Sequence, residues 1–161
     1  MKPKRPVRVK QFQYDGFGFP LILLDVPMRN CRGVDIPDID YNVLQRLVLE
    51  DLSHKSSPLT GNEIRFIRQS LGMTFTEFAR HFGLTHAAVI KWEKTKNNFA
   101  KITPSMELYI RLYILDHLKV NNKQFRSSFA AFDGNAKLKK FDKAATPPTK
   151  PLKIESRKLC A

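Results

Sequence analysis

The sequence predicts a mainly α protein: a helix-turn-helix bundle with a small N-terminal β-hairpin before it and a disordered basic C-terminal tail after it. Three observations lead to this fold class. Helix start signals repeat at short intervals between residues 59 and 104, an Asp-Gly pair separates two apolar stretches near the N-terminus, and the C-terminal region is rich in proline and lysine. We expect three parts: a hairpin plus a helix over 1–57, the helix-turn-helix domain over 58–120, and the largely disordered tail over 121–161.

The hairpin is predicted over residues 6–28. Asp15-Gly16 favours a type I′ turn, because glycine accepts the positive φ that such a turn requires. The apolar run 21–24 suits a buried strand. Pro20 and Pro27 bound this run and favour an edge position, because proline donates no hydrogen bond to a neighbouring strand.

A first helix is expected after a turn-like, acidic segment at 29–42. Asp40 is a candidate cap for this helix, which extends to about residue 52. One helix face is apolar: Val43, Leu44, Leu47, Val48 and Leu52. The polar stretch 53–58, SHKSSP, follows as a linker and a plausible hinge.

Four further helices follow this linker, and each has its own start signal. Two of them carry a threonine and a glutamate at the spacing of a capping box, the third has a threonine cap, and the fourth has proline at its first position. In chain order these signals are Thr60 with Glu63, Thr74 with Glu77, Thr85, and Thr103-Pro104.

The second and third of these helices have the residues that a helix-turn-helix needs. Ala79 is small enough for two backbones to approach closely, and Gly83 accepts the left-handed conformation of a tight turn. Apolar residues are spaced to form a small core between the two helices: Phe78, Phe82, Leu84, Val89 and Trp92. Ordinary core packing accounts for these apolar residues singly, whereas the complete set at this spacing favours a helix-turn-helix.

Residues 61–94, GNEIRFIRQSLGMTFTEFARHFGLTHAAVIKWEK, resemble the helix-turn-helix of the phage-repressor (Xre) family. The longer stretch from PDIDYNVL at 37–44 to the fourth helix is similar to the DNA-binding half of MqsA-type (YgiT-type) antitoxins. The resemblance implies a lambda-repressor-like fold and a DNA-binding domain that binds a palindromic operator on double-stranded DNA as a homodimer. It also implies an autorepressor of a toxin-antitoxin operon, with a RelE-like toxin as a further partner.

The resemblance assigns roles to individual residues. The helix after Thr85 becomes the recognition helix, which lies in the major groove. The base-reading positions are Thr85, His86, Ala87, Ile90 and Lys91. The candidate phosphate contacts are Thr74, Thr76, Arg80, Lys94, Lys96, Asn97 and Lys101. Lys91 can donate to guanine, His86 is either a reader or an ordinary exposed histidine, and Ala87 offers only apolar contact.

The sequence departs from both families at some positions. Phe75 stands where relatives usually have a glutamine that holds a phosphate. Cys31 is followed by Arg-Gly-Val, so the paired C-x-x-C motifs of the MqsA zinc module are missing and we expect no metal site. At two other positions the sequence agrees with the phage-repressor family: Arg68 and Glu93 match a pair that forms a salt bridge in several repressors.

The fourth helix is apolar on two faces, and both need to be buried. One face can cover the helix-turn-helix, and the other is a candidate dimer interface formed by Met106, Tyr109, Ile110 and Tyr113. The alternative is a larger monomeric core that includes the helix at 43–52.

The net charge of +13 is concentrated at the two ends of the chain. Residues 1–15 have five basic residues and one acidic residue, and residues 119–161 have eleven and three. Such segments either attract DNA without reading its sequence or act as solvated tails.

Other function classes find no support in the sequence. No apolar run approaches the roughly 20 residues that span a bilayer, and no signal peptide is visible, so we expect a soluble cytoplasmic protein without a membrane partner. No paired carboxylates, activated nucleophile or phosphate-binding glycine loop indicates an enzyme or a cofactor. The main alternative to a DNA-binding regulator is a protein-binding antitoxin module that neutralises a toxin, with DNA binding secondary. The apolar side chains of Phe75, Ala87 and Ile90 favour that alternative.

Overall fold

The computed structural model describes residues 7–127, 151–155 and 159, and 46% of them are helical and 23% lie in strands. The strands form a four-stranded mixed sheet, so the predicted fold class, a mainly α bundle with a small hairpin, is wrong. The chain divides into two compact units. Unit 1 comprises Met1–Val48 and Lys150–Ala161, and unit 2 comprises Leu49–Thr149.

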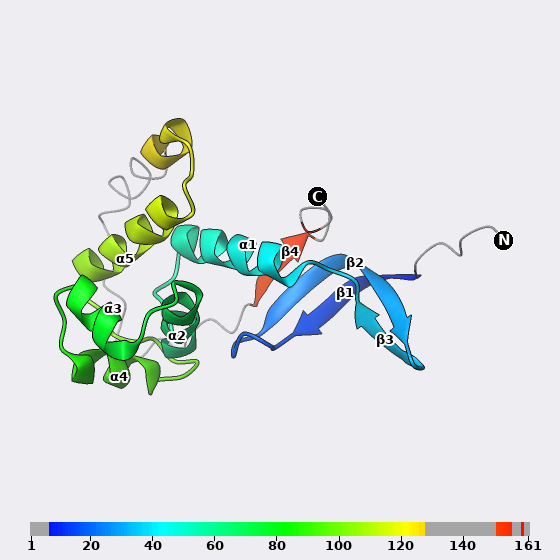
Figure 1. Cartoon of the computed structure of the whole chain (residues 1–161), viewed down its shortest axis with the longest axis horizontal. Coiled ribbons are helices and arrows are strands. Elements are labelled where there is room, and N and C mark those ends of the chain that lie inside the picture. Colours follow the sequence, from blue (N-terminus) through cyan, green and yellow to red (C-terminus); the bar gives the residue numbers. More distant parts are fainter. Residues whose placement is uncertain (1–6, 128–150, 156–158, 160–161) are drawn as a thin grey trace. The chain divides into compact units, whose positions relative to one another are not determined.

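Unit 1 contains the sheet (Figure 1), and its central strand is β2 (Leu21–Cys31). Strand β1 (Val7–Tyr14) pairs antiparallel with β2 along one edge, in the register Tyr14↔Leu21 to Val7↔Met28. On the other edge, β3 (Val34–Pro37) pairs antiparallel with Met28–Cys31, and β4 (Leu152–Glu155) pairs parallel with Leu21–Leu24.

The type I′ turn lies in a different place from the predicted one. Gly16 does not adopt a positive φ; instead the β1–β2 connection spans residues 15–20, with a hydrogen bond from Gly18 N to Asp15 O of 3.0 Å. The two-residue turn with positive φ at both positions is Arg32-Gly33, at 52° and 85°, between β2 and β3. The segment predicted as turn-like therefore contains a hairpin strand.

Pro27 does not mark an edge strand, because β2 has strand partners on both edges. One edge of β2 is shared by β4, which pairs up to Leu24, and by β3, which pairs from Met28 onward. Pro27 lies between these two paired segments. A missing N–H therefore interrupts neither ladder on that edge.

The predicted disordered tail contributes a strand. Ile154 in β4 is 3% exposed, and Leu159 is 2% exposed. The apolar residues of PLKIE alternate with charged ones, which suits a strand with one buried face. Residues 122–127 are helical. The rest of the predicted tail, including residues 128–150, lies outside the described residues.

Helix α1 (Tyr41–His54) begins in unit 1 and ends in unit 2. The predicted cap is confirmed, because Asp40 Oδ1 accepts from Asn42 N at 2.8 Å. Of its predicted apolar face, Leu44 and Val48 are fully buried in unit 1 and Leu52 in unit 2. The remaining two residues of that face, Val43 and Leu47, are half-buried.

Unit 2 contains the four predicted helices α2 (Gly61–Ser70), α3 (Phe75–His81), α4 (His86–Glu93) and α5 (Pro104–His117). Both capping boxes are confirmed: in α2 and in α3 the threonine hydroxyl accepts from the glutamate N–H, and the carboxylate accepts from the threonine N–H. Thr85 caps α4 through Ala88 N at 3.2 Å. Thr103 makes no side-chain cap bond, so α5 starts with Pro104 alone.

The linker 53–58 is held in place, contrary to its interpretation as a hinge. The buried guanidinium of Arg111 on α5 donates to main-chain carbonyl oxygens in this segment and at the end of α1. Those carbonyls belong to Leu52, Ser53, Lys55 and Ser57. Lys55 also forms an ion pair with Glu63 at 2.7 Å. These contacts tie the linker to α5 and to Glu63 of α2, which does not suit a hinge.

Gly61 marks a close approach of α2 to the segment after α4. A Cβ at this position would overlap the carbonyl oxygen of Trp92, the hydroxyl of Thr95 and the backbone nitrogen of Lys96. Two of these atoms are backbone and cannot rotate away. Glycine is therefore required here for space and not for a positive φ.

We expect Gly61→Ala to lower the free energy of unfolding of unit 2 by about 1–3 kcal/mol, the usual cost of overpacking. Urea denaturation followed by the fluorescence of Trp92, the chain's only tryptophan, measures the change. Ser70→Ala, later in the same helix, is the control and should change stability by less than about 0.5 kcal/mol. Equal stability of Gly61→Ala and wild type would show that the two backbones can move apart.

Candidate nucleic-acid interface

A glycine turn joins α3 to α4, as predicted. Gly83 has φ of 66°, Leu84 N donates to Ala79 O at 2.7 Å, and Gly83 N donates to Arg80 O at 3.3 Å. This pair of bonds is a Schellman motif, which satisfies the last carbonyls of α3 and reverses the chain at once. Ala79 is 3% exposed, in agreement with its predicted role at the close approach of the helices.

The predicted apolar core between α3 and α4 is also present. Phe78 and Val89 are fully buried, and Phe82 is 3% exposed. The rings of Phe78 and Phe82 lie with their centroids 4.6 Å apart. Leu84 and Trp92 are half-buried at the margin of this core. The face of α4 opposite Val89 is therefore free to face outward.

That outward face carries the predicted base-reading residues. Thr85, His86, Ala87 and Lys91 are exposed, and Ile90 is half-buried. Ala87 and Lys91 are one helical turn apart, so they lie in one row along α4. The hydroxyl of Thr85 already accepts the capping bond, which leaves its proton and one lone pair for another partner.

Four predicted phosphate contacts lie at the end of α4 and after it: Lys94, Lys96, Asn97 and Lys101, all exposed. Backbone bonds fix this loop to the start of α2, from Asn62 N to Lys96 O at 2.8 Å and from Gly61 N to Asn98 O at 3.2 Å. The Asn62 side chain also donates to the Asn97 side chain at 2.9 Å. The fold thus presents these polar groups on a fixed loop.

The charges of unit 2 are arranged unevenly. Ion pairs join Glu63 to Lys55, Glu93 to Arg68 and Glu107 to Arg111. Within residues 7–127 and 151–155, by contrast, no ion-pair partner is found for the four exposed lysines on and after α4: Lys91, Lys94, Lys96 and Lys101. The exposed lysines on and after α4 are therefore not neutralised by ion pairs within the described part of the chain.

The start of α3 is a poorer phosphate site than predicted. Thr76 is exposed, but the Thr74 hydroxyl accepts from Glu77 N at 3.2 Å, and Thr74 N donates to the Glu77 carboxylate at 2.7 Å. These bonds to Thr74, and then the charge of Arg80, lower the pKa of Glu77. A phosphate at Thr74 would meet an ionised carboxylate already in that place.

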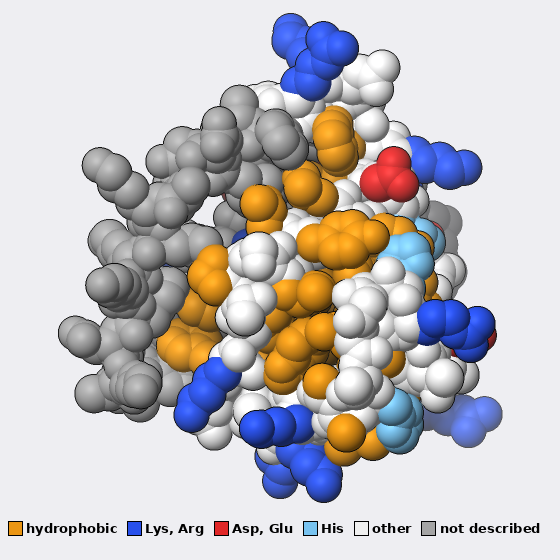
Figure 2. Space-filling model, turned by 90° about the vertical axis from the view of Figure 1, so that its left-hand side faces the viewer, with side chains coloured by type: hydrophobic (Ala, Val, Ile, Leu, Met, Phe, Trp, Pro, Cys, Tyr) orange, Lys and Arg blue, Asp and Glu red, His pale blue; other side chains and the backbone are white. Residues whose placement is uncertain are grey.

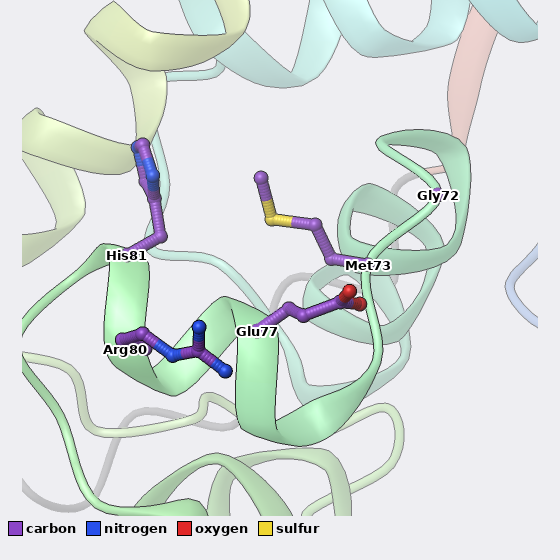
Figure 3. Close-up of a pocket in the computed structure, with 5 residues that line it drawn as sticks. All are labelled: Gly72, Met73, Glu77, Arg80 and His81. Atoms are coloured by element: carbon purple, nitrogen blue, oxygen red, sulfur yellow. The ribbon is translucent and has the colours of Figure 1, made fainter.

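Arg80, another predicted phosphate contact, borders a hollow of about 580 Å³ on α3 and the turn before it. Figure 3 shows Met73 pointing into this hollow and the Arg80 side chain running toward Glu77. Gly72 and His81 complete its lining, and no residue of α4 takes part. The hollow is therefore separate from the base-reading face.

Phe75 takes a role that the sequence did not reveal. The predicted ion pair of Arg68 and Glu93 is confirmed at 2.6 Å, and the Arg68 guanidinium carbon lies 4.0 Å from the centre of the Phe75 ring. The Phe75 ring also meets the His86 ring edge-to-face, with the centroids 5.7 Å apart. Phe75 thus bridges a fixed cation on α2 and a predicted base-reading residue on α4.

The predicted dimer residues of α5 differ in how much of their surface is left exposed within one chain. Tyr109 and Tyr113 pack against Phe82, the residue that ends α3, at centroid distances of 5.1 and 5.5 Å, so this face of α5 covers the end of α3. Ile110 is fully buried within the chain and has no surface left for a second copy. Tyr109 remains 45% exposed, and Met106 and Tyr113 are half-buried.

Figure 2, seen from the side where α3, α4 and α5 lie, shows hydrophobic side chains gathered centrally with lysines and arginines toward the margins.

No cluster of three or more potential metal ligands is found among the described residues. No helix in that part of the chain combines the length and apolar character needed to cross a bilayer. Comparison with protein-family models, with curated proteins and with solved structures gave no match.

Proposed function

We propose that the chain is a sequence-specific DNA-binding transcriptional regulator that uses α4 as its reading helix. The observation that carries the proposal is the exposed row on α4 together with four lysines that lack acidic partners among the described residues. A helix of this kind fits the major groove, and positive charge beside it favours the phosphate backbone.

The proposed readout uses few directional contacts. Lys91 donates to guanine O6 or N7, and His86 hydrogen-bonds a base edge. Ala87 and Ile90 offer apolar contact to a thymine methyl group. Lysines 94, 96 and 101 bind phosphates, which position the helix without specifying sequence.

The wider proposal is an antitoxin-like autorepressor that occupies a palindromic operator as a homodimer. In this proposal two copies place their α4 helices about one turn of DNA apart and block a promoter. The exposed ring of Tyr109 is the part of the predicted dimer interface best placed to meet a second copy. Basic residues at the two ends of the chain add affinity that is independent of sequence.

Replacing Lys91 with alanine should weaken binding to the selected operator by about 1–3 kcal/mol and relax the preference at one base pair. The operator is first identified by selection from random duplexes, and affinities are then measured by fluorescence anisotropy at a fixed salt concentration. Lys123→Ala, an exposed lysine after α5, is the control for a loss of one positive charge. Equal losses on operator and random DNA would make Lys91 a phosphate contact only.

The second candidate function is a protein-binding antitoxin module that holds a RelE-like toxin. The apolar side chains of Ala87 and Ile90 on the outward face of α4, and the hydrophobic cluster in Figure 2, favour it. Co-purification with a small basic nuclease would support this function. Tight operator binding by the chain alone would count against it.

A further inference from the structure

Phe75, the first residue of α3, contacts side chains from both neighbouring helices. The guanidinium of Arg68 on α2 lies over its ring, 4.0 Å from the centroid. His86, the first residue of α4, meets the same ring edge-to-face at 5.7 Å and 78°. Edge-to-face pairs and cations over a ring face are both favourable geometries for an aromatic side chain.

Arg68 provides a rigid support for this ring. Its Nε and Nη2 donate to the two carboxylate oxygens of Glu93 at 2.6 and 3.1 Å, and its Nη1 donates to Met73 O at 2.9 Å. Arg68 is 8% exposed, so the guanidinium is both buried and bound on three sides. The contacts form a continuous series from Glu93 through Arg68 and Phe75 to His86.

His86 is the residue that most needs such support. It is exposed, and an exposed side chain samples several rotamers that must be given up when it binds a base. Its neighbour Ala87 has no polar group to share the readout. A ring already held in one orientation loses less freedom on binding and discriminates better between base pairs.

We infer that Phe75 is a positioning residue that sets the base preference of His86, although Phe75 itself touches no base. This inference rests on the proposed function and deepens it. It explains what a phenylalanine does at a position where it cannot hold a phosphate. It also predicts a base-pair preference that depends on a side chain outside the reading helix.

The test compares Phe75→Leu, Phe75→Tyr, His86→Ala and the double variant Phe75→Leu/His86→Ala in the full chain. The first readout needs no DNA: the His86 ring protons are followed by NMR, because the ring current of Phe75 shifts them. Phe75→Leu should move these resonances toward the values of a free histidine, and Phe75→Tyr should leave them near wild type. Tyr41→Leu, an aromatic-to-leucine change in unit 1, is the control and should leave them unchanged.

The second readout is the base preference of each variant, measured by selection from random duplexes and by affinity ratios between single-base operator variants. His86→Ala and Phe75→Leu should each lower discrimination at the same base pair by about fivefold to tenfold, and the double variant should lose no more than either. Affinity for random DNA and the melting temperature should change little. Phe75→Tyr should restore the preference.

Several results would overturn the inference. Additive losses in the double variant, or losses at different base pairs, would show that the two residues act separately. A uniform loss of affinity together with a lower melting temperature would make Phe75 a purely structural residue. Unchanged His86 resonances in Phe75→Leu would exclude positioning even in the free protein. A wild-type chain that selects no sequence overturns the proposed function instead, and the NMR result then still decides whether the Phe75 and His86 rings are in contact in the free protein.

Discussion

Replacing Arg111 with methionine is expected to lower the free energy of unfolding of unit 2 by about 3–5 kcal/mol, because it leaves several buried polar groups without a partner. Methionine fills a similar volume but donates no hydrogen bond. The groups that lose their donor are the carboxylate of Glu107 and the carbonyl oxygens of Leu52, Ser53, Lys55 and Ser57.

The large effect follows from where Arg111 lies in the fold. One side chain from α5 binds the end of α1 and the whole linker that leads to α2, and its partner Glu107 also accepts from Leu59 N at 3.2 Å. Arg111 is 6% exposed, so water cannot easily replace it. The loss should therefore affect the start of α2 as well as α5.

Urea denaturation followed by Trp92 fluorescence measures this prediction, since Trp92 lies in unit 2. Arg126→Met is the matched control, because Arg126 is exposed and its replacement should cost less than about 0.5 kcal/mol. Arg111→Lys should fall between the two, since an ammonium keeps the charge but lacks the planar fork of donors. A loss below about 1 kcal/mol in Arg111→Met would show that other groups satisfy these carbonyls.

The helix starts were predictable because their causes are local. A threonine and a glutamate three residues apart can only satisfy one another when the chain turns into a helix between them, as at Thr60 and Thr74. The same holds for Gly83, whose left-handed backbone is a property of one residue. Local signals of this kind predict the ends of helices whatever tertiary contacts the rest of the chain makes.

The sheet was not predictable in the same way, because its pairing joins distant residues. Strand β4 pairs Leu152 with Leu21, and nothing within a local window of sequence reveals that partner. A proline- and lysine-rich context favoured disorder over a four-residue strand. Strand β2 is central because β1 and β3 pair with its two edges, and β3 lies in a segment that was predicted as turn-like, so Pro27 gave a misleading edge signal.

Some features of the candidate site were predictable from the sequence, and others were not. The outward row of Ala87 and Lys91 follows from helical spacing once Val89 is assigned to the core. The burial of Ile110 and the contact of Phe75 with His86 depend on how α3 and α4 pack against their neighbours. The apolar side chain of Phe75 was the available signal, and it was taken to favour a protein-binding surface, whereas the structure shows its ring in contact with Arg68 and His86.

The second large effect concerns Glu93 on α4. Glu93→Ala should lower the free energy of unfolding of unit 2 by about 3–5 kcal/mol, because it leaves the Arg68 guanidinium buried without its partner. Glu93 is 2% exposed and also accepts from Arg65 at 3.3 Å, so its carboxylate joins two arginines of α2 to the end of α4. Asp116→Ala is the control, an exposed carboxylate on α5 whose removal should change stability little.

The double variant Arg68→Met/Glu93→Met separates the charge from the shape of the pair. If the cost in Glu93→Ala comes from an unpaired buried charge, removing both charges should recover most of the lost stability, since apolar side chains of similar size often replace a buried ion pair without loss. Urea denaturation followed by circular dichroism is the appropriate measurement, because Trp92 adjoins the mutated position. A double variant as unstable as Glu93→Ala would instead mean that the geometry of the bidentate pair, and not the buried charge, holds α4 against α2.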